Sequence, residues 1–469
     1  LVSLVSKALF VEETNPLFSG SFLATSGSKS ILDMAINFKK TDRINEVEYF
    51  KISYEIDVEI SRVCELDLEL EKEISKDQGF NIYAGEVHSI EGQSPERERP
   101  GFSRSGFEKS TDLFRFCIKN GVDATQAMNI LNNGNYIEDD TVTWFANSFL
   151  SYLLGSSFGR WDIRFATGQK TEPQLNSPTD TVGPSSPGML QVSRGETGQI
   201  GATLDRYPIK ICEGGILVDD PNHPKDIERH LQSSLEVVWK GKAEQIESEI
   251  CEILSVSSVR NYFSRPNGFF KDHLERYSRS RRKAPIYWPL STSSGSYTLW
   301  IYYPSLTSQT LYTAVNDFIE GPNGKLQQVE NDLVALRNKG SARSAVDEKN
   351  FEKLQAFETE LIELRETILE IAPSYRPNHD DGVQISAAPL WRLFRHKPWQ
   401  KILKATWDKL ENGDYDWAHL AMAYWPNRVR EKCKTDKSLA IAHDLEGLYE
   451  EPEVAPGAKR GRKKAGAAT

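Results

Sequence analysis

The sequence predicts a helix-rich α+β protein of several domains, with a β-hairpin region, an antiparallel helical hairpin and a C-terminal helical domain. Three observations support this fold class. Two aromatic runs flank a small polar loop at 291–295, apolar residues repeat every three or four positions between 326 and 371, and tryptophans recur in a helical stretch from 390 to 450. With 469 residues, 39% of them hydrophobic, the chain is long enough for about two to four domains.

Shifts in composition mark the domain boundaries, and the main one is a stretch at 168–206 that is rich in Pro, Ser, Thr and Gly. Just before it, Arg160 and Arg164 share one face if the preceding helix continues, and we expect a packed helix there. The predicted segments are a mixed α/β remnant at 1–92, a helical region at 93–167, a linker at 168–206, a helical region with a basic and aromatic β-hairpin at 207–320, an antiparallel helical hairpin at 321–375, a tryptophan-rich helical domain at 376–450 and a disordered basic tail at 451–469.

Residues 226–254 carry apolar positions at helical spacing, which predicts one amphipathic helix or two with a break near Gly241. Before them, Asp219, Asp220 and His223 follow a short predicted strand. These three residues are metal ligands by type, but their spacing fits a proline-bounded turn and a helix N-cap at least as well. We therefore expect no metal site in this loop.

The central feature of the chain is the stretch from Tyr277 to Ile319. Four positive charges fall within residues 279–283 and lead directly into an aromatic strand at 286–288, and residues 296–303 alternate as a second strand. Arginines beside planar aromatics suit nucleic acid, because guanidinium groups bind phosphate and base edges while rings stack on exposed bases. The alternative is a core hairpin whose aromatic side chains are buried and whose arginines are solvated.

After the hairpin, two apolar series run from Leu326 to Leu336 and from Leu354 to Ile371, with the polar segment 338–344 between them. This pattern predicts an antiparallel helical hairpin with a coiled-coil-like seam, its second helix about 40 Å long. We interpret it as a spacer or a dimerisation arm.

The tryptophan-rich stretch that follows predicts a compact helical domain with buried tryptophans. A later group of basic residues lies at 428–437, and the tail beyond Pro452 is basic as well. A second basic surface is expected on the first helices of this domain, at Arg392, Arg395, His396, Lys397, Lys401 and Lys404.

Charge and cysteine usage limit the classes of function. A net charge of −10 excludes a uniformly basic surface, so any contact with nucleic acid must be a local patch. Five widely spaced cysteines fit neither a disulfide framework nor a C-x-x-C metal site, which indicates a reducing compartment. No apolar run approaches the length of about 18 residues that spans a bilayer, and we expect a cytoplasmic protein without membrane contact. Because position 1 is Leu, we expect the back portion of a longer product.

Five sequence blocks occur together: RRKAPIYWPLSTSSGSYTLWIYY at 281–303, SYLLGSSFGRWDIRFATG at 151–168, GILVDDPNHP at 215–224, RPNHDDGVQISAAPLW at 376–391 and YDWAHLAMAYWPNRVREKCKTDKSLAIAH at 415–443. The chain resembles, over residues 140–450, the C-terminal region of large bacterial adenine-specific DNA methyltransferases. These are the enzymes of bacteriophage-exclusion (BREX) defence systems and related single-chain restriction-modification enzymes.

The resemblance implies a site-specific adenine-N6 DNA methyltransferase whose full-length form uses S-adenosylmethionine. Such an enzyme needs a glycine-rich turn for this cofactor and an Asp/Asn-Pro-Pro-Tyr/Phe motif for the flipped adenine. This chain contains neither a G-x-G nor a Pro-Pro dipeptide, so we expect no cofactor site and no catalytic residue in it. Its expected role is DNA binding and target recognition, with double-stranded DNA as the partner. The residues expected to contact DNA are Arg279, Arg281, Arg282, Lys283, Tyr287 and Trp288.

Two other classes of function stay open. A non-catalytic interaction module would use the helical hairpin and the tryptophan-rich domain to dock other subunits of a defence complex. An enzyme would have its site in two acidic loops, at Asp219, Asp220 and His223 and at His379, Asp380 and Asp381.

Overall fold

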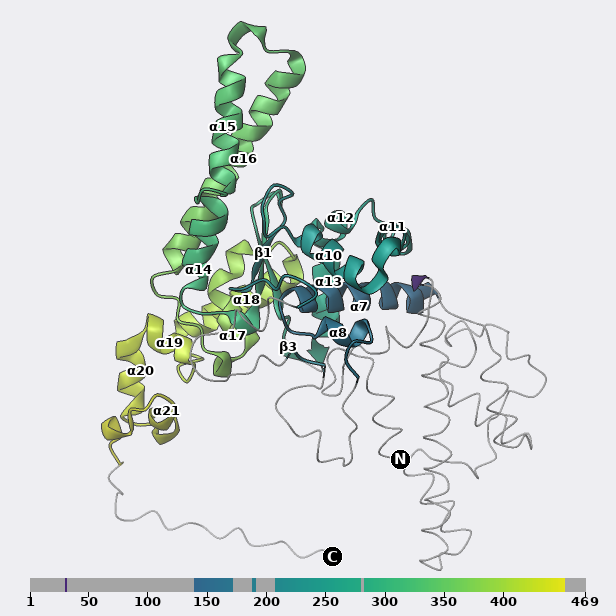
Figure 1. Cartoon of the computed structure of the whole chain (residues 1–469). Coiled ribbons are helices and arrows are strands. Elements are labelled where there is room, and N and C mark those ends of the chain that lie inside the picture. The colour runs from purple at the N-terminus through teal and green to yellow at the C-terminus, as the bar shows by residue number, and fades with distance from the viewer. Residues whose placement is uncertain (1–29, 32–138, 172–187, 191–206, 280–281, 452–469) are drawn as a thin grey trace, which may run out of the picture. The chain divides into compact units, whose positions relative to one another are not determined.

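The computed structural model describes residues 30–31, 139–171, 188–190, 207–279 and 282–451. The chain divides into two compact units, residues 1–277 and 278–469 (Figure 1). Helices dominate the described parts of both units and the strands are short, which confirms the predicted helix-rich α+β class. None of the described helices combines the length and the apolar character that a membrane span requires. Apart from residues 30–31, the predicted remnant at 1–92 lies outside the described residues, as do most of the predicted linker and nearly all of the basic tail.

The N-terminal unit is built around the apolar helix α7. Its side chains Phe145, Phe149 and Leu150 are buried, and α10, α11 and α13 contact it. The described elements of this unit are α7 (Asp139–Ser157), α8 (Ile163–Ala166), β1 (Ile216–Val218), α10 (Ile227–Trp239), η2 (Lys240–Lys242), α11 (Ala243–Ile253), α12 (Val259–Ser264) and α13 (Phe269–Arg276).

Two predicted helical stretches of this unit are interrupted. The apolar series at 226–254 forms α10 and α11 with a 3-10 turn between them, and this confirms the alternative with a break near Gly241. In the other stretch, α7 ends at Ser157, before Gly159. Gly159 has a φ of 75°, a left-handed conformation that glycine adopts at little cost. The expectation that Arg160 and Arg164 share one face required the helix to continue through both residues. Because α7 ends first, they do not share the face of one continuous helix.

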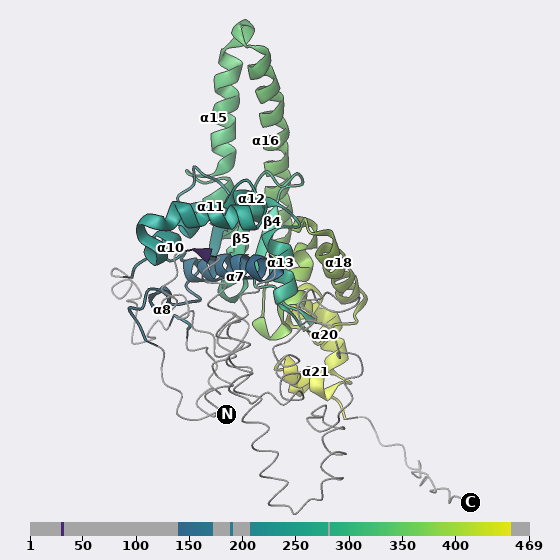
Figure 2. The same cartoon turned by 90° about the vertical axis from the view of Figure 1, so that its right-hand side faces the viewer.

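The C-terminal unit has three parts: a β-hairpin, a helical arm and a set of terminal helices (Figure 2). Its elements are β2 (Ser278–Arg279), β3 (Arg282–Lys283), β4 (Tyr287–Ser291), β5 (Thr298–Tyr302), η3 (Tyr303–Ser305), α14 (Thr310–Thr313), the π-helical turn η4 (Ala314–Ile319), α15 (Lys325–Asn338), η5 (Gly340–Ala342), α16 (Ala345–Ile371), η6 (His379–Asp381), α17 (Val383–Ala387), η7 (Ala388–Leu393), α18 (Lys397–Asn412), α19 (His419–Tyr424), α20 (Pro426–Cys433), α21 (Lys437–Ala442) and η8 (Glu446–Leu448).

The predicted hairpin is formed by β4 and β5. They pair antiparallel from Tyr287 opposite Tyr302 to Ser291 opposite Thr298. All five residues of β5 are buried, and so are four of the five in β4. Because side chains alternate between the two faces of a strand, burial at successive positions means that both faces of this hairpin are covered.

The predicted helical hairpin is formed by α15 and α16, which we call the arm (Figure 1). Its buried residues lie near its base, where Leu333 of α15 and Leu364 of α16 are almost fully covered. Ser344 and Asp347 form a capping box that starts α16 by satisfying backbone N–H groups at its first turn. At 27 residues, α16 is about 40 Å long.

The base of the arm is tied to the β-hairpin by polar contacts. Glu360 of α16 accepts hydrogen bonds on Oε2 from the Ser294 backbone N–H at 3.3 Å and the Ser296 hydroxyl at 3.2 Å, both in the loop between β4 and β5. Arg365 of the same helix binds Glu320, at 3.0 Å from Nη1 to Oε1. The polar loop of the hairpin therefore orients the arm within this unit.

The terminal helices enclose a small aromatic core. Trp399 of α18 is fully buried, and Trp407 contacts the rings of Tyr424 and Trp425. Trp417 differs from the expectation of buried tryptophans, since it is 50% exposed.

Candidate nucleic-acid interface

The predicted basic cluster lies on a very short antiparallel ribbon. Ser278 pairs with Lys283 and Arg279 pairs with Arg282, which makes the strands β2 and β3. Arg282 is exposed and Lys283 is half-buried. Arg281 and the side chain of Arg279 lie outside the described residues. Of the predicted cluster, Arg282 is therefore accessible to solvent and Lys283 is partly accessible.

The aromatic half of the predicted contact is wrong. Tyr287 and Trp288 are fully buried, so neither ring is available to stack on a base. Trp288 donates its indole N–H to the Pro285 carbonyl at 2.7 Å and packs against Tyr303, and Tyr287 stacks on Tyr302. These two residues belong to the core, as in the alternative interpretation of the hairpin, because both faces of the hairpin are covered.

A second cationic surface lies on α18. Lys397, Lys401 and Lys404 are exposed at a spacing that places them on one side of the helix, while Trp399 and Leu403 are buried. We call these three lysines the lysine face. The first turn of α18 carries no acidic residue, and a lysine at a helix N-terminus, as Lys397 is, opposes the macrodipole. Lys397 donates to Gln400 at 3.2 Å and Lys404 lies over the ring of Trp391 at 5.2 Å, and all three lysines are exposed to an external anion.

The other basic residues predicted for this surface have structural contacts. Arg392 binds Glu370 at 2.7 Å, and His396 is buried. Arg395 packs directly on Gly295, where an added Cβ would lie 1.5 Å from its Nη1 atom. Of the predicted basic surface, Arg392 and the three lysines are exposed, and only Arg392 among these four forms an ion pair with an acid that the structure describes.

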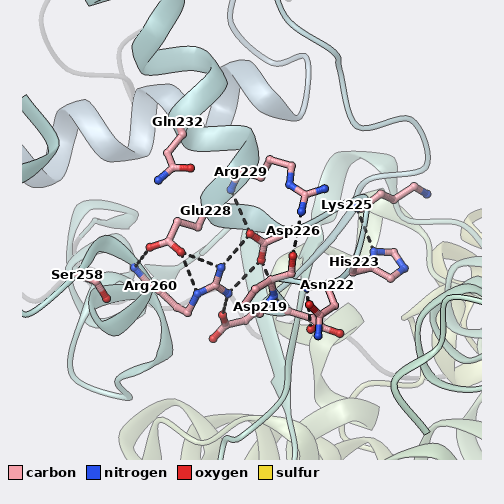
Figure 3. A network of polar contacts seen from close by, with 12 residues as sticks. Asp219, Asn222, His223, Lys225, Asp226, Glu228, Arg229, Gln232, Ser258 and Arg260 are labelled. Carbon is pink, nitrogen blue, oxygen red and sulfur yellow. Dashed lines mark hydrogen bonds and ion pairs between the residues drawn. The ribbon is translucent and has the colours of Figure 1, made fainter. Parts of the chain in front are cut away.

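One of the two acidic loops considered for an enzyme site forms a buried ion-pair network (Figure 3). Arg260 of α12 lies among Asp219, Asp226 and Glu228, which we call the Arg260 cluster. Its guanidinium bonds Asp226 Oδ2 at 2.9 Å, Glu228 Oε2 at 3.0 Å and the carboxylate of Asp219. The Arg260 side chain is 22% exposed, so most of this network is shielded from water.

The carboxylates of the Arg260 cluster also organise the turn before α10. Asp226 accepts the backbone N–H of Arg229 at 3.2 Å as an N-cap, and it accepts the backbone N–H of Asp220 at 3.1 Å. His223 accepts the backbone N–H of Lys225 on Nδ1 at 3.1 Å. These contacts support the turn and N-cap interpretation. Among the residues that the structure describes, no three His, Cys, Asp or Glu side chains form a metal-binding group.

Burial raises the pKa of Asp219, and the nearby carboxylates of Asp226 and Glu228 raise it further. Arg260 acts in the opposite direction and does not outweigh them. A single guanidinium thus serves three acids, and the cluster has no surplus cation to offer a ligand.

The second acidic loop is structural as well. Asp381 accepts the backbone N–H groups of His419 and Leu420 at 2.8 and 2.9 Å, which fixes the start of α19. His379 bonds the Tyr303 carbonyl through Nε2 at 3.0 Å. These contacts tie the loop to its neighbours and give no support to a catalytic arrangement.

Another ionic cluster has the inverse composition. Asp162, whose side chain is fully buried, accepts Arg164 Nη2 at 2.7 Å, Lys170 Nζ at 3.2 Å and the Tyr207 hydroxyl at 3.3 Å. We call Asp162, Arg164, Lys170 and Tyr207 the Asp162 cluster. Burial raises the pKa of Asp162, but the hydrogen bonds and charge of Arg164 and the bond from Lys170 outweigh it and lower the pKa below its ordinary value. In the sequence, Asp162 and Arg164 lie two residues apart, and this spacing could have indicated their ion pair. The expectation of a continuous packed helix there led away from it.

No protein-family model matches the chain, and no curated protein matches it significantly. The resemblance carried by the sequence blocks stays a prediction.

Proposed function

We propose that this chain is the DNA-binding, target-recognition part of a site-specific adenine-N6 DNA methyltransferase of a phage-defence or restriction-modification system. The observation that carries the DNA-binding role is the lysine face of α18, where three exposed lysines lie on one side of the first half of the helix. The exposed Arg282 on the β2–β3 ribbon adds to it. The sequence blocks supply the methyltransferase context.

The lysine face suits the charge density of duplex DNA. From Lys397 to Lys404 the helix rises about 10 Å, and over that length duplex DNA carries about six phosphates. Lysine is a compact positive charge on a flexible stem, which reaches phosphate oxygens without reading bases. We therefore assign the lysine face to backbone contacts, which set the position of the protein on the duplex.

Methyl transfer belongs, in this proposal, to the longer parent protein. S-adenosylmethionine would be the cofactor of that parent, and no residue described above is assigned to it. The chain contributes affinity and position on the DNA, and the transfer itself is outside its proposed role.

The test compares two lysine pairs that have the same spacing on exposed helix faces. The slope of log affinity against log salt is negative, by about 0.9 for each phosphate contact. Lys397→Gln with Lys401→Gln removes two contacts and should make this slope shallower by about two. The matched control is Lys349→Gln with Lys353→Gln on α16, both exposed. Binding of the full chain to duplex DNA is measured by fluorescence anisotropy. An equal effect of both pairs, or none, would contradict the proposal.

A second candidate function is docking of other defence-complex subunits through the arm. Val334 and Val346 are 48% and 68% exposed toward the end of the arm, where apolar residues serve no core. Replacing both with Asp should weaken association with purified partner subunits and leave DNA affinity unchanged. Unchanged association with every subunit would reject the docking role.

A further inference from the structure

We infer that the Asp162 cluster is a second phosphate-contact surface, located on the N-terminal unit and directed at the phosphodiester groups of nucleic acid. This inference rests on the proposed DNA-binding function, and it adds a site that neither the predicted basic cluster nor the lysine face includes. Two cations, Arg164 and Lys170, share the single carboxylate of Asp162, which leaves a surplus positive charge.

The hydrogen bonds to Asp162 show that its carboxylate has more donors than it needs. Its two oxygens accept the Arg164 backbone N–H at 3.2 Å, Arg164 Nε at 2.8 Å and Nη2 at 2.7 Å, Lys170 Nζ at 3.2 Å and the Tyr207 hydroxyl at 3.3 Å. An ionised carboxylate offers about four lone-pair sites, so five donors already saturate it. Without Lys170, four donors would still remain for the carboxylate of Asp162.

The position of the charges favours a ligand on the outside. The side chains of Arg164 and Lys170 are each 40% exposed, whereas that of Asp162 is 0% exposed. The carboxylate therefore holds both cations from the inner side and leaves their outer sides to solvent. A phosphate approaching from solvent meets positive charge before it meets the carboxylate.

Aromatic rings hold the same cations in place. Arg164 lies over the ring of Tyr207 at 5.4 Å, and Lys170 Nζ lies over that of Phe165 at 4.7 Å. Side chains that are ordered before binding lose less conformational entropy when they contact a ligand. The rings and the buried carboxylate thus preorganise both cations.

A third cation extends the surface along the chain. Arg160 lies over the ring of its neighbour Trp161 at 4.3 Å and over that of Tyr277 at 5.5 Å, and it donates to the Tyr277 hydroxyl. These ring contacts and the bond to Tyr277 hold the guanidinium of Arg160 in place. Arg160, Arg164 and Lys170 thus place three ring-held cations within eleven residues of a chain whose net charge is −10.

The test uses the full chain and duplex DNA. Arg164→Gln with Lys170→Gln should weaken binding and make the fall of log affinity with log salt shallower by about two, since two phosphate contacts are lost. Lys242→Gln with Lys271→Gln removes two exposed lysines from the same unit and should leave the slope unchanged. If the wild-type chain binds DNA and both double variants behave like it, this inference fails while the proposed function stands. If the wild-type chain binds no DNA, the proposed function itself fails.

A second measurement avoids any effect of the substitutions on folding. Acetylation of surface lysines in the wild-type chain, followed by mass spectrometry, reports which amines DNA covers. Lys170 should react several-fold more slowly when duplex DNA is present, and Lys242 should react at an unchanged rate. Equal reactivity of Lys170 with and without DNA, under conditions where the chain is bound, would overturn the inference.

Discussion

The Arg260 cluster and the Asp162 cluster contain the same kinds of side chain in opposite proportions. In the first, one guanidinium serves three carboxylates, and its side chain is 22% exposed. In the second, one fully buried carboxylate serves two cations that are 40% exposed. The first satisfies itself and closes a turn, while the second keeps positive charge at the surface. Stoichiometry and exposure together therefore separate a structural ion pair from a candidate binding site.

The pKa directions follow the same division. Burial and neighbouring acids raise the pKa of Asp219, whereas hydrogen bonds and charge from two cations outweigh burial and lower the pKa of Asp162. The first carboxylate is short of positive charge and the second has more than it needs.

The largest expected effect comes from removing the shared guanidinium. Arg260→Met should lower the free energy of unfolding by about 3–5 kcal/mol, because it leaves carboxylates buried without their cation. Urea unfolding followed by tryptophan fluorescence measures it. A loss below about 1 kcal/mol would show that water replaces the guanidinium and that the cluster is not closed.

Removing the buried carboxylate of the other cluster should cost less. Asp162→Asn should lower the free energy of unfolding by about 2 kcal/mol, a range typical of hydrogen bonds to a charged group. Arg164 and Lys170 can turn to solvent after the change, so no buried charge is left behind. A loss as large as that of Arg260→Met, in the same urea experiment, would remove the distinction between the clusters.

The two clusters should respond to pH with opposite sign. The pKa of Asp162 is lower in the folded chain, so its contribution is present above about pH 4 and is lost as pH falls through the folded pKa. The pKa of Asp219 is higher in the folded chain, so its contribution is present below about pH 4 and is lost as pH rises through the folded pKa. Free energies of unfolding of Asp162→Asn and Asp219→Asn, measured against wild type over this range, should diverge in opposite directions. Parallel curves would contradict the assigned environments.

The smallest effect is expected at an ordinary surface pair. Lys271 lies 3.3 Å from Glu275 and 3.9 Å from Asp272, and its side chain is 46% exposed. Lys271→Gln should change the free energy of unfolding by less than about 0.5 kcal/mol. A larger change would mean that exposure alone does not identify a weak ion pair in this unit.

Local patterns predicted the fold better than the site. The arm and the β4–β5 hairpin follow from apolar spacing and turn residues, because the contacts that make them lie close in the sequence. Arg260 could not be identified in this way, since it lies 34 residues from Asp226 and 41 from Asp219. Trp288 was assigned to DNA because aromatic composition suits a stacking surface and a core equally. Coverage of both hairpin faces decides between them, and that depends on tertiary packing.

The most direct test of the account measures how salt affects duplex DNA binding by the full chain when both cationic surfaces are removed. Wild type is compared with a variant that combines Arg164→Gln, Lys170→Gln, Lys397→Gln and Lys401→Gln, between about 50 and about 200 mM salt. The account predicts a steep linear fall of log affinity for wild type and a slope smaller by about four for the variant, with both proteins folded by circular dichroism. A wild-type affinity that does not change with salt, or equal slopes for the two proteins, would contradict it.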